Sequence, residues 1–474
     1  MPRRTKIVAT LGPATDDREA LEAVIRAGVD MVRLNFSHGE AADHQRRGRM
    51  VREAAAAVGR DVAVLADLQG PKIRIARFRD GAVDLQDGAA FFLDADLDDD
   101  AGTQDGVGLG YRELPGDVGA GDVLLLDDGQ IVLRVESVEG SRIHCRVELG
   151  GPLSNNKGIN RQGGGLSAAA LTDKDRQDIL TAAQMGVDYV AVSFPRAASD
   201  MDEARSLLQA AGSEAGLVAK IERAEAVEAL DAIAEASEAV MVARGDLAVE
   251  IGDAELPGVQ KRIIARAREL NRVVITATQM MESMITQANP TRAEVLDVAN
   301  AVMDGTDAVM LSAETATGRY PVRTVEAVHR VCEGAERQRI TRHSSYRIDS
   351  VFERTDEAIA MAAMYTANHL GVAALLALTE SGATALWMSR ISSGLPIYAL
   401  TQHDATRRRV TLYRGVYPLA FDAHKRPADR VVDDAVVALR DSGAVHAGER
   451  VIVTKGELSG IAGGTNSLQI VTVT

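Results

Sequence analysis

The stretch that decides the fold runs from Leu217 to Gly252, LVAKIERAEAVEALDAIAEASEAVMVARGDLAVEIG, and its pattern predicts a strand, a helix and a second strand. Lys220 and Glu222 stand two positions apart, so a strand backbone places the ammonium and the carboxylate on the same face. The second strand, Ala239 to Ala243, leads into a turn that carries Asp246. A lysine and two carboxylates at the ends of adjacent parallel strands could hold a divalent cation beside an anionic substrate. A surface salt bridge between neighbouring units is the alternative interpretation.

The strand and helix pattern recurs on both sides of this stretch. Six further apolar runs each begin a new unit, and with the two strands above they make eight: Lys6 to Thr10, Met31 to Asn35, Val62 to Asp67, Tyr189 to Ser193, Val273 to Thr278 and Ala308 to Ser312. Parallel strands that are buried on both faces have such continuous apolar sequences. The pattern therefore predicts an α/β fold with a closed (β/α)8 TIM barrel, and an open doubly wound sheet is the runner-up.

The repeat is interrupted once and then ends. Between residues 71 and 170 it stops for about 100 residues, whereas loops in such units normally have about 2 to 6. This segment contains many glycines and short strands such as VLLLDD and IVLRVESV, which predict a small β-barrel or sandwich. A separate α/β pattern follows the barrel. We expect residues 1–70 and 171–338 to form the barrel, 71–170 an inserted β lid domain, and 339–474 a C-terminal α/β domain.

The composition narrows the possible partners. The chain has 474 residues, 46% apolar and 26% charged, and a net charge of −15, which argues against a general binder of nucleic acid or of anionic membranes. Cys145 and Cys332 are its only cysteines, so a disulfide framework is excluded and a reducing compartment fits. The amino-terminal MPRRTKIVATLG lacks an apolar signal core, and no segment approaches the ~20 apolar residues that span a bilayer. We expect a soluble, cytoplasmic protein.

The ends of the predicted strands collect polar side chains. Barrels of this type place their chemistry at the carboxyl ends of the strands, which favours an active site over a salt bridge. A lysine beside a carboxylate-bound metal, with Arg33 to meet a phosphate, suits transfer of a phosphoryl group from an enolate. The N–H groups at Gly245 and Asp246 could receive a substrate carboxylate. The strand ends carry Thr10, Arg33, Asn35, Asp67, Ser193, Lys220, Glu222, Asp246, Thr278, Gln279, Ser312 and Glu314.

The sequence has no GxxxxGKS loop and no protein-kinase signature, so a nucleotide would be held in another way, with the inserted domain as a lid. In the C-terminal domain, the turn Thr379 to Thr384 and the segment Lys455 to Thr465 combine hydroxyls with free N–H groups. Such turns bind phosphate well. Ordinary capped turns are the alternative interpretation.

Long uninterrupted motifs resemble those of pyruvate kinase over essentially the whole chain. They include TKIVATLGPA, VRLNFSHG, DLQGPKIR, GGPLSNNKGIN, KIERAEAV, MVARGDLAVEIG, ITATQMMESM, NPTRAEVLDVANAVMDGTDAVMLSAET and the closing GGTNSLQIV. The resemblance implies Mg²⁺-dependent phosphoryl transfer from phosphoenolpyruvate to ADP, giving pyruvate and ATP in glycolysis, with Mn²⁺ able to replace Mg²⁺. It also implies a three-domain plan and a homotetramer.

The resemblance assigns roles to individual residues. It implies that Glu222 and Asp246 bind Mg²⁺ and that Lys220 stabilises the transferring phosphoryl group and the enolate. Arg33 matches the phosphate-binding arginine, and Thr278 a substrate-contacting threonine implicated in proton transfer. The substrate-binding set is Arg33, Lys220, Ala243, Gly245, Asp246 and Thr278, and the nucleotide-binding set is Asn35, His38, Arg74 and Lys157. The proton donor to the enolate stays open, and a solvated loop lysine is the alternative for Lys157.

The family's monovalent-cation site matches Asn35, Ser37, Asp67 and the carbonyl of Leu68. Potassium-dependent members carry Thr-Lys-Gly-Pro-Glu after that aspartate, whereas this chain has Leu68-Gln69-Gly70-Pro71-Lys72. The sequence therefore resembles the potassium-independent branch. Our hypothesis is that the ammonium of Lys72 replaces K⁺, so that K⁺ is not required.

The implied effector site is Thr379, Ser381, Gly382, Thr384 and Lys455. The chain has Glu380 inside the first turn, Ala383 where a basic residue is frequent, and no Trp in the closing loop. A carboxylate beside a phosphate is unfavourable unless it is compensated. We therefore expect activation by a monophosphate, either a sugar phosphate or AMP, rather than by fructose 1,6-bisphosphate.

Two other functions fit parts of the sequence. A Mg²⁺-dependent aldolase or lyase acting on a pyruvate enolate could use the same barrel, but it needs no nucleotide lid. A catalytically silent phosphometabolite-binding protein is the second, and retention of every matched catalytic residue type argues against it.

Overall fold

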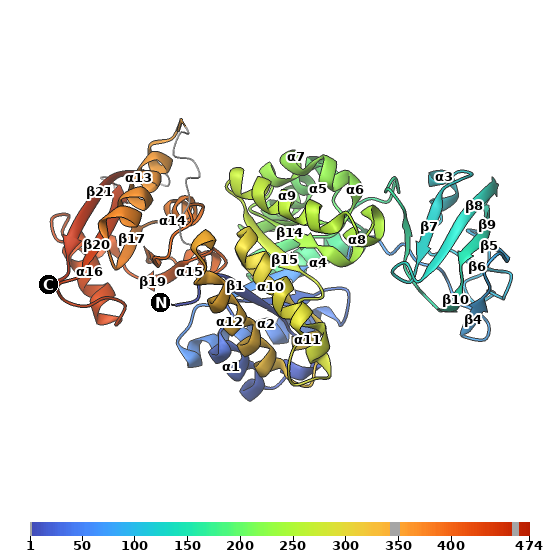
Figure 1. The fold of residues 1–474 in the computed structure, drawn as a ribbon, viewed down its shortest axis with the longest axis horizontal. Helices are drawn as coiled ribbons and strands as arrows, with labels where there is room; N and C mark the ends of the chain where they lie inside the picture. Colours follow the sequence, from blue (N-terminus) through green and yellow to red (C-terminus); the bar gives the residue numbers. More distant parts are fainter. Residues whose placement is uncertain (1, 342–350, 457–463) are drawn as a thin grey trace.

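The computed structural model describes residues 2–341, 351–456 and 464–474, and its three parts follow one another along an elongated molecule (Figure 1). The barrel lies in the middle, the inserted β domain at one end and the C-terminal α/β domain at the other. The amino terminus lies beside the junction between the barrel and the C-terminal domain.

Eight parallel strands close the central barrel in the order β1-β16-β15-β14-β13-β12-β3-β2. The predicted closed barrel is confirmed, and the open sheet is excluded because β1 pairs with both β16 and β2. Their core positions are almost all buried, as expected for strands covered on both faces. The strands are Lys6–Thr10 (β1), Met31–Asn35 (β2), Ala63–Asp67 (β3), Tyr189–Val192 (β12), Gly216–Ile221 (β13), Ala239–Ala243 (β14), Val273–Ala277 (β15) and Ala308–Leu311 (β16).

Helices surround this barrel, and their first turns show why they begin where they do. Asp17 accepts the N–H of Ala20 at 2.8 Å, and Thr172 and Thr291 form capping boxes with Asp175 and Glu294. The helices are Arg18–Ala27 (α1), Ala41–Val58 (α2), Asp173–Gln184 (α4), Ala198–Ala210 (α5), Ala224–Glu228 (α6), Leu230–Glu235 (α7), Arg244–Ile251 (α8), Leu256–Glu269 (α9), Arg292–Asp304 (α10), Ala313–Ala316 (α11) and Pro321–Glu336 (α12), with 3₁₀ turns at Pro13–Thr15 (η1), Glu282–Ile285 (η2) and Arg339–Thr341 (η3).

The turn predicted after the sixth barrel strand is instead the start of a helix. Helix α8 begins at Arg244, directly after β14 ends at Ala243. Gly245 and Asp246 therefore lie in the first helical turn, where backbone N–H groups have no partner within the helix. This difference keeps the expected N–H donors at the mouth of the barrel.

The inserted domain has a hydrophobic core of its own, separate from that of the barrel. Its strands form a six-stranded sheet, β11-β7-β8-β9-β5-β6, and a two-stranded sheet, β10-β4. The predicted inserted β domain is thus present, although hydrogen bonds do not close these described strands into one barrel. The elements are Ala82–Leu85 (β4), Ala90–Asp94 (β5), Gly106–Gly108 (β6), Leu114–Asp117 (α3), Val123–Leu126 (β7), Ile131–Glu139 (β8), Arg142–Leu149 (β9), Gly151–Ser154 (β10) and Ile159–Arg161 (β11).

The C-terminal domain is a five-stranded sheet in the order β19-β18-β17-β20-β21, parallel except for β21. Helices cover this sheet (Figure 1). The elements are Thr355–Leu370 (α13), Ala374–Leu378 (β17), Ala383–Ser389 (α14), Ile397–Thr401 (β18), Asp404–Val410 (α15), Val416–Ala420 (β19), Ala423–Lys425 (η4), Val431–Asp441 (α16), Arg450–Gly456 (β20) and Thr465–Thr472 (β21).

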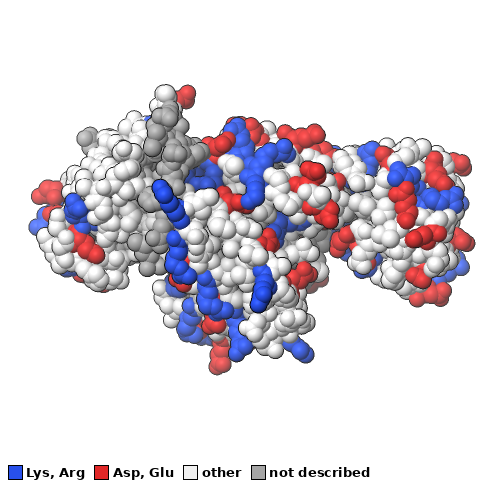
Figure 2. Space-filling model, in the orientation of Figure 1, with Lys and Arg blue, Asp and Glu red and all other residues white. Residues whose placement is uncertain are grey.

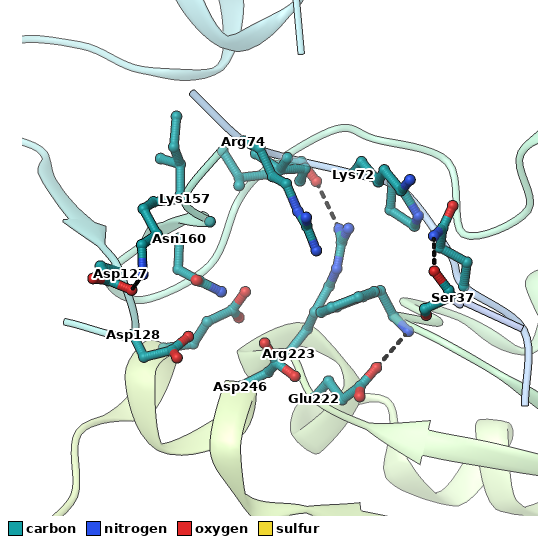
Figure 3. A pocket seen from close by; sticks show the side chains of 18 of the residues that line it. Ser37, Lys72, Arg74, Asp127, Asp128, Lys157, Asn160, Glu222, Arg223 and Asp246 are labelled. Atoms are coloured by element: carbon teal, nitrogen blue, oxygen red, sulfur yellow. Dashed lines mark hydrogen bonds and ion pairs between the residues drawn. The ribbon is translucent and has the colours of Figure 1, made fainter. Parts of the chain in front are cut away.

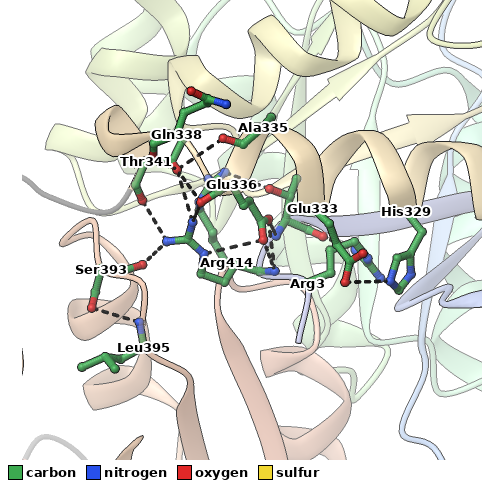
Figure 4. A network of polar contacts seen from close by, with 12 residues as sticks. Arg3, His329, Glu333, Ala335, Glu336, Gln338, Thr341, Ser393, Leu395 and Arg414 are labelled. Carbon is green, nitrogen blue, oxygen red and sulfur yellow. Dashed lines mark hydrogen bonds and ion pairs between the residues drawn. The ribbon is translucent and has the colours of Figure 1, made fainter. Parts of the chain in front are cut away.

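Buried polar contacts join the C-terminal domain to the floor of the barrel. Arg390 and Asp307 form an ion pair in which each side chain is only 1% exposed, and Arg390 Nη1 lies 3.0 Å from Asp307 Oδ2. Arg4 donates to the carbonyl of Thr341 at 2.8 Å and to that of Ser393. Figure 4 labels the two acceptor residues. Buried groups with such partners fix the two domains at one relative position.

One apolar side chain of the C-terminal domain belongs to the interior of the barrel. Leu412, which follows α15, is fully buried in the same cluster as barrel residues such as Val8, Leu65 and Met241. A fully buried leucine contributes about 1.5–3 kcal/mol. The floor of the barrel is therefore completed by the other domain.

The surface in Figure 2 carries both signs of charge. Basic and acidic side chains alternate over the barrel and the inserted domain on the face shown. None of the helices in the described part of the chain combines the length and apolar character needed to cross a bilayer.

Candidate active site

Lys220 is the centre of a buried charge cluster at the carboxyl end of β13. Its Nζ lies 2.8 Å from Glu222 Oε1 and 3.5 Å from Asp67 Oδ1, and it donates to Ser193 Oγ at 2.8 Å. Burial opposes the charged form, but Asp67 and Glu222 outweigh it and raise the pKa of Lys220. The ammonium is therefore kept charged although it is only 12% exposed.

Asp67 joins Lys220 to Arg33. Arg33 Nε lies 2.5 Å from Asp67 Oδ2, and Arg33 Nη1 donates to Thr10 Oγ1 at 3.2 Å. Burial alone would raise the pKa of Asp67, but Lys220 and Arg33 lower it. Three predicted site residues from β2, β3 and β13 thus form one ion-pair network.

Glu222 and Asp246 are the two carboxylates predicted to bind Mg²⁺. Glu222 is 2% exposed, and burial raises its pKa to about 7 in spite of Lys220. Burial also raises the pKa of Asp246. Such desolvated carboxylates are stabilised in their charged form by a cation, so the donor set fits a divalent metal.

The described residues contain no group of three or more His, Cys, Asp and Glu side chains that could hold a metal by themselves. Mg²⁺ commonly takes only one or two protein carboxylates and completes its shell with water and substrate oxygens. Two carboxylates are therefore sufficient for that ion.

Thr278 has a strained backbone. Its φ is +67°, which a β-branched residue rarely adopts, and its Oγ1 accepts the N–H of Gly245 at 3.0 Å. Strain of this kind is concentrated at functional sites. The N–H of Gly245, which the sequence predicts as a free donor for a carboxylate, is paired with this hydroxyl, so a substrate would have to share or replace the contact.

A cavity of about 410 Å³ separates the mouth of the barrel from the inserted domain. Glu222 and Asp246 lie on its barrel side (Figure 3), and Lys220 of β13 also lines it. Arg74 and Lys157 lie on the side of the inserted domain, where Lys157 Nζ is 2.7 Å from Asp127 Oδ1. The predicted nucleotide residues of the lid thus face the predicted metal and phosphoryl-transfer residues.

The predicted monovalent-cation group lies beside β3. Asn35 Oδ1 accepts the N–H of Ser37 at 3.2 Å, and the carbonyl of Leu68 accepts from Ser193 Oγ at 2.7 Å. Asp67 Oδ1 is buried and accepts no hydrogen bond among the described residues. Gly70 follows with a φ of +69°, and a Cβ there would stand 2.8 Å from that of Ser193, so only glycine fits.

Lys72 is exposed and lines the same cavity as Ser37. It makes no ion pair with the described residues, and the cations paired with Asp67 are Arg33 and Lys220.

His38 is exposed, and its backbone N–H donates to the carbonyl of Asn35. It does not line the cavity. Ala243 is buried at the end of β14, directly before α8.

Several cavity residues were missed by the sequence analysis. Asp127 and Asp128 occupy a tight turn between β7 and β8 with φ near +50°, and Glu250 and Arg223 line the barrel rim. The only signal for Arg223 is its place directly after Glu222. Alternation along the strand says nothing about it because β13 ends at Ile221.

The predicted effector turn is held by its own hydroxyls. Thr379 Oγ1 accepts the N–H of Gly382 at 2.9 Å, and the hydroxyls of Thr384 and Thr465 lie 2.7 Å apart. Ser381 Oγ accepts from Ala383 N at 3.4 Å. The closing loop, residues 457–463, lies outside the described residues, whereas Lys455 stands at the end of β20.

Glu380 does not stand alone in that turn. His403 Nε2 lies 2.6 Å from its Oε2, and His424 Nε2 lies 3.2 Å from its Oε1. The carboxylate that the sequence predicted to repel a phosphate therefore has two imidazole partners.

Comparison with known proteins agrees with this architecture. The family model for the pyruvate kinase barrel domain matches residues 2–325, and the model for the pyruvate kinase alpha/beta domain matches residues 357–471. The crystal structure of a pyruvate kinase from Cryptosporidium parvum superposes with a TM-score of 0.92 at 31% identity, covering 100% of this chain and 96% of that one.

Curated bacterial relatives are similar over nearly their full length. Pyruvate kinase II of Salmonella typhimurium is 58% identical over 477 residues, covering 99% of both chains. Pyruvate kinase of Haemophilus influenzae is 56% identical over 458 residues, covering 96% of both. These matches show that the chain belongs to the pyruvate kinase family of phosphotransferases.

Proposed function

We propose that the protein transfers a phosphoryl group from phosphoenolpyruvate to ADP, giving pyruvate and ATP. One observation carries the proposal. Lys220, held by Asp67 and Glu222, faces Arg74 and Lys157 across a single cavity. Cations on both sides of such a space suit a phosphoryl group that moves from one bound anion to another.

The barrel side would bind phosphoenolpyruvate. Arg33 and Lys220 bind the phosphate, and Lys220 also stabilises the enolate left after transfer. Glu222 and Asp246 hold Mg²⁺, or Mn²⁺ in its place, and the bound ion supplies charge neutralisation for the transferring group. The fixed ion pairs to Asp67 orient both cations in advance, which reduces the reorganisation needed at the moment of transfer.

Thr278 and the start of α8 would bind the carboxylate of the substrate. The N–H groups of Gly245 and Asp246 lie in the first turn of α8, where the helix favours an anion. When the substrate takes the N–H of Gly245, Thr278 Oγ1 loses a donor and can accept a proton or hydrogen bond from another group. Its own O–H donates to the carbonyl of Ala277 at 2.6 Å, so passing that proton to the enolate would require this contact to break and the hydroxyl to take up a second proton.

The inserted domain would act as the nucleotide lid. Arg74 and Lys157 bind the phosphates of ADP. Asn35 and His38 do not line the cavity in this structure, and we propose that they contact the nucleotide from the barrel once it is bound. The Lys157–Asp127 ion pair, 2.7 Å long, would hold the Lys157 side chain on the lid before the nucleotide binds. Closure excludes water from the transfer.

We further propose that Lys72 makes K⁺ unnecessary at the group formed by Asn35, Ser37, Asp67 and Leu68. Its place in the cavity beside Ser37 supports this.

The C-terminal domain would bind a monophosphate effector, either a sugar phosphate or AMP, at the turn Thr379 to Thr384 and at Lys455. We expect a cytoplasmic homotetramer that binds neither nucleic acid nor membranes. Both cysteines are buried and free, as expected in a reducing compartment. A thermal-shift screen of phosphometabolites tests the effector, since a ligand of the folded state raises Tm.

ATP formation from phosphoenolpyruvate and ADP by the purified protein tests the reaction. We expect it with Mg²⁺ or Mn²⁺ and none after chelation. No observation on the described residues favours the aldolase, since an aldolase reaction would not use lid cations such as Lys157. Condensation of pyruvate with an aldehyde, without ATP formation, would replace our proposal with that activity.

A further inference from the structure

Arg223 is a buried cation with an unused donor. The residue is 2% exposed, and its Nη1 donates to the carbonyl of Leu166 at 3.0 Å. Its Nη2 is also buried and has no hydrogen-bond partner among the described residues. An unpaired donor of a buried charged group costs free energy unless a ligand satisfies it.

The surroundings of Arg223 do not supply that partner. Within the described residues no carboxylate oxygen comes within the 4.0 Å of an ion pair with Arg223, although Glu250 lines the same cavity. The ring of Phe194 lies 5.5 Å from the guanidinium carbon. Arg223 is thus held in place by a ring and a carbonyl, and its Nη2 is left without a hydrogen-bond partner among the described residues.

Arg223 lines the cavity, and Figure 3 shows its guanidinium and that of Arg74 at the same cavity. The Nη2 of Arg223 is covered in this structure, so a ligand would reach that atom after a small movement of the side chain. Two cations that converge repel each other unless an anion lies between them. The planar guanidinium fork matches the oxygens of a phosphate.

We propose that Arg223 binds a phosphate of the nucleoside diphosphate. It binds this phosphate from the barrel rim, and Arg74 binds the same phosphate from the lid. This rests on the proposed function for the identity of the nucleotide. A phosphate held by both residues ties the lid to the rim, because Arg74 precedes the inserted strands and Arg223 directly follows Glu222. Nucleotide binding and lid closure would then be one event.

The test compares Arg223→Gln and Arg223→Lys with a matched control, Arg196→Gln. Arg196 also donates to the carbonyl of Leu166, at 3.5 Å, but does not line the cavity. We expect Arg223→Gln to raise the Kd of ADP, measured by calorimetry without turnover, about 10- to 100-fold, as for loss of a hydrogen bond between charged groups. Arg223→Lys should recover part of this affinity, and Arg196→Gln should bind ADP as the unaltered protein does.

Two results would overturn the inference. One is an unchanged Kd in Arg223→Gln. The other is an equal loss in Arg223→Gln and Arg196→Gln, which would mean that both act only through Leu166. If Arg223→Gln fails to fold, the Kd of Arg223→Lys decides, together with Arg74→Gln and the double variant Arg74→Gln/Arg223→Lys. A shared phosphate predicts less than additive losses in that cycle, and full additivity contradicts it.

The ADP measurement is independent of the reaction. If ADP binding depends on Arg223 but the protein makes no ATP, this inference holds and the proposed function is wrong. If the protein makes ATP but its affinity for ADP does not change in Arg223→Gln, the proposed function holds and this inference is wrong. The KM for phosphoenolpyruvate should change little in Arg223→Gln, which separates a nucleotide contact from general damage to the site.

Discussion

Lys220 Nζ and Glu222 Oε1 lie 2.8 Å apart at the mouth of the barrel, with the lysine 12% and the glutamate 2% exposed. Burying such an ion pair costs desolvation free energy, and buried charges of this kind are concentrated at functional sites.

Removing the lysine tests that task. We expect Lys220→Met to lower kcat by about 100- to 1000-fold, as for loss of one preorganised donor at developing charge. Steady-state kinetics with phosphoenolpyruvate and ADP measures this, with circular dichroism as the check on folding. Lys261→Met, an exposed lysine paired with Asp304 on the outside of the barrel, serves as control. Full activity in folded Lys220→Met would refute the assignment.

The hydroxyl of Thr278 has a separate prediction. Thr278→Val keeps the β-branched shape at the strained φ but loses the acceptor of the Gly245 N–H. We expect kcat to fall by about 100-fold or more if that hydroxyl moves a proton. Thr278→Ser keeps the hydroxyl and should retain most of the activity. Equal losses in both variants would point to packing rather than to the hydroxyl.

Changing the charge of Lys72 tests whether this residue replaces K⁺. In tetramethylammonium buffers we expect the unaltered protein to turn over at the same rate with and without K⁺. Lys72→Glu should lower the K⁺-free rate about tenfold or more, a barrier change of about 1.4 kcal/mol, and added K⁺ should restore it. Collapse of the unaltered protein without K⁺ would contradict the hypothesis.

The Arg390–Asp307 pair should matter for stability rather than for chemistry. Arg390→Met leaves a buried carboxylate without its main partner, so we expect a loss of about 3–5 kcal/mol and a lower Tm by calorimetry. Arg390→Met/Asp307→Leu removes both charges and should recover much of that loss. A single variant with an unchanged Tm would show that the pair contributes little.

Lys6 gives a prediction for pH. Burial lowers its pKa from 10.5 to about 8, where its Nζ donates to the carbonyl of Val416 at 2.5 Å. Between these two values the unfolded chain binds more protons than the folded one, so this residue adds stability as pH rises from about 8 to 10.5. The Tm of the unaltered protein minus the Tm of Lys6→Met should therefore increase between pH 7.5 and about 9.5. A constant difference across this range would mean that Lys6 keeps its charge when buried.

The barrel could be predicted from the sequence because each strand is a run of apolar residues and each helix shows the helical spacing of its apolar residues. The order of the pairs follows from chain order once the barrel closes. The open sheets of the inserted domain were harder to predict, because short glycine-rich strands do not specify their partners. The start of α8 at Arg244 was also missed, since nothing in the sequence separates a turn from a first helical turn there.

The site was accessible only in part for similar reasons. The two-residue spacing of Lys220 and Glu222 brings them together, although Glu222 lies one position beyond the end of β13. The pairing of Asp67 with both Arg33 and Lys220 depends on how three strands are placed around the barrel, which spacing along one strand does not reveal. The left-handed φ of Thr278 has no sequence signal, because β-branched residues avoid that conformation.

The burial of Leu412 in the barrel floor has a consequence for synthesis on the ribosome. β1 ends at Thr10, yet the cluster that lines the barrel is complete only when residue 412 has been made. At about 5–20 residues per second, translation delays that step by roughly 20 to 80 seconds after the first strand emerges. During this time the nascent barrel exposes an apolar floor, so chaperone binding to the growing chain should persist until the α15 segment leaves the exit tunnel.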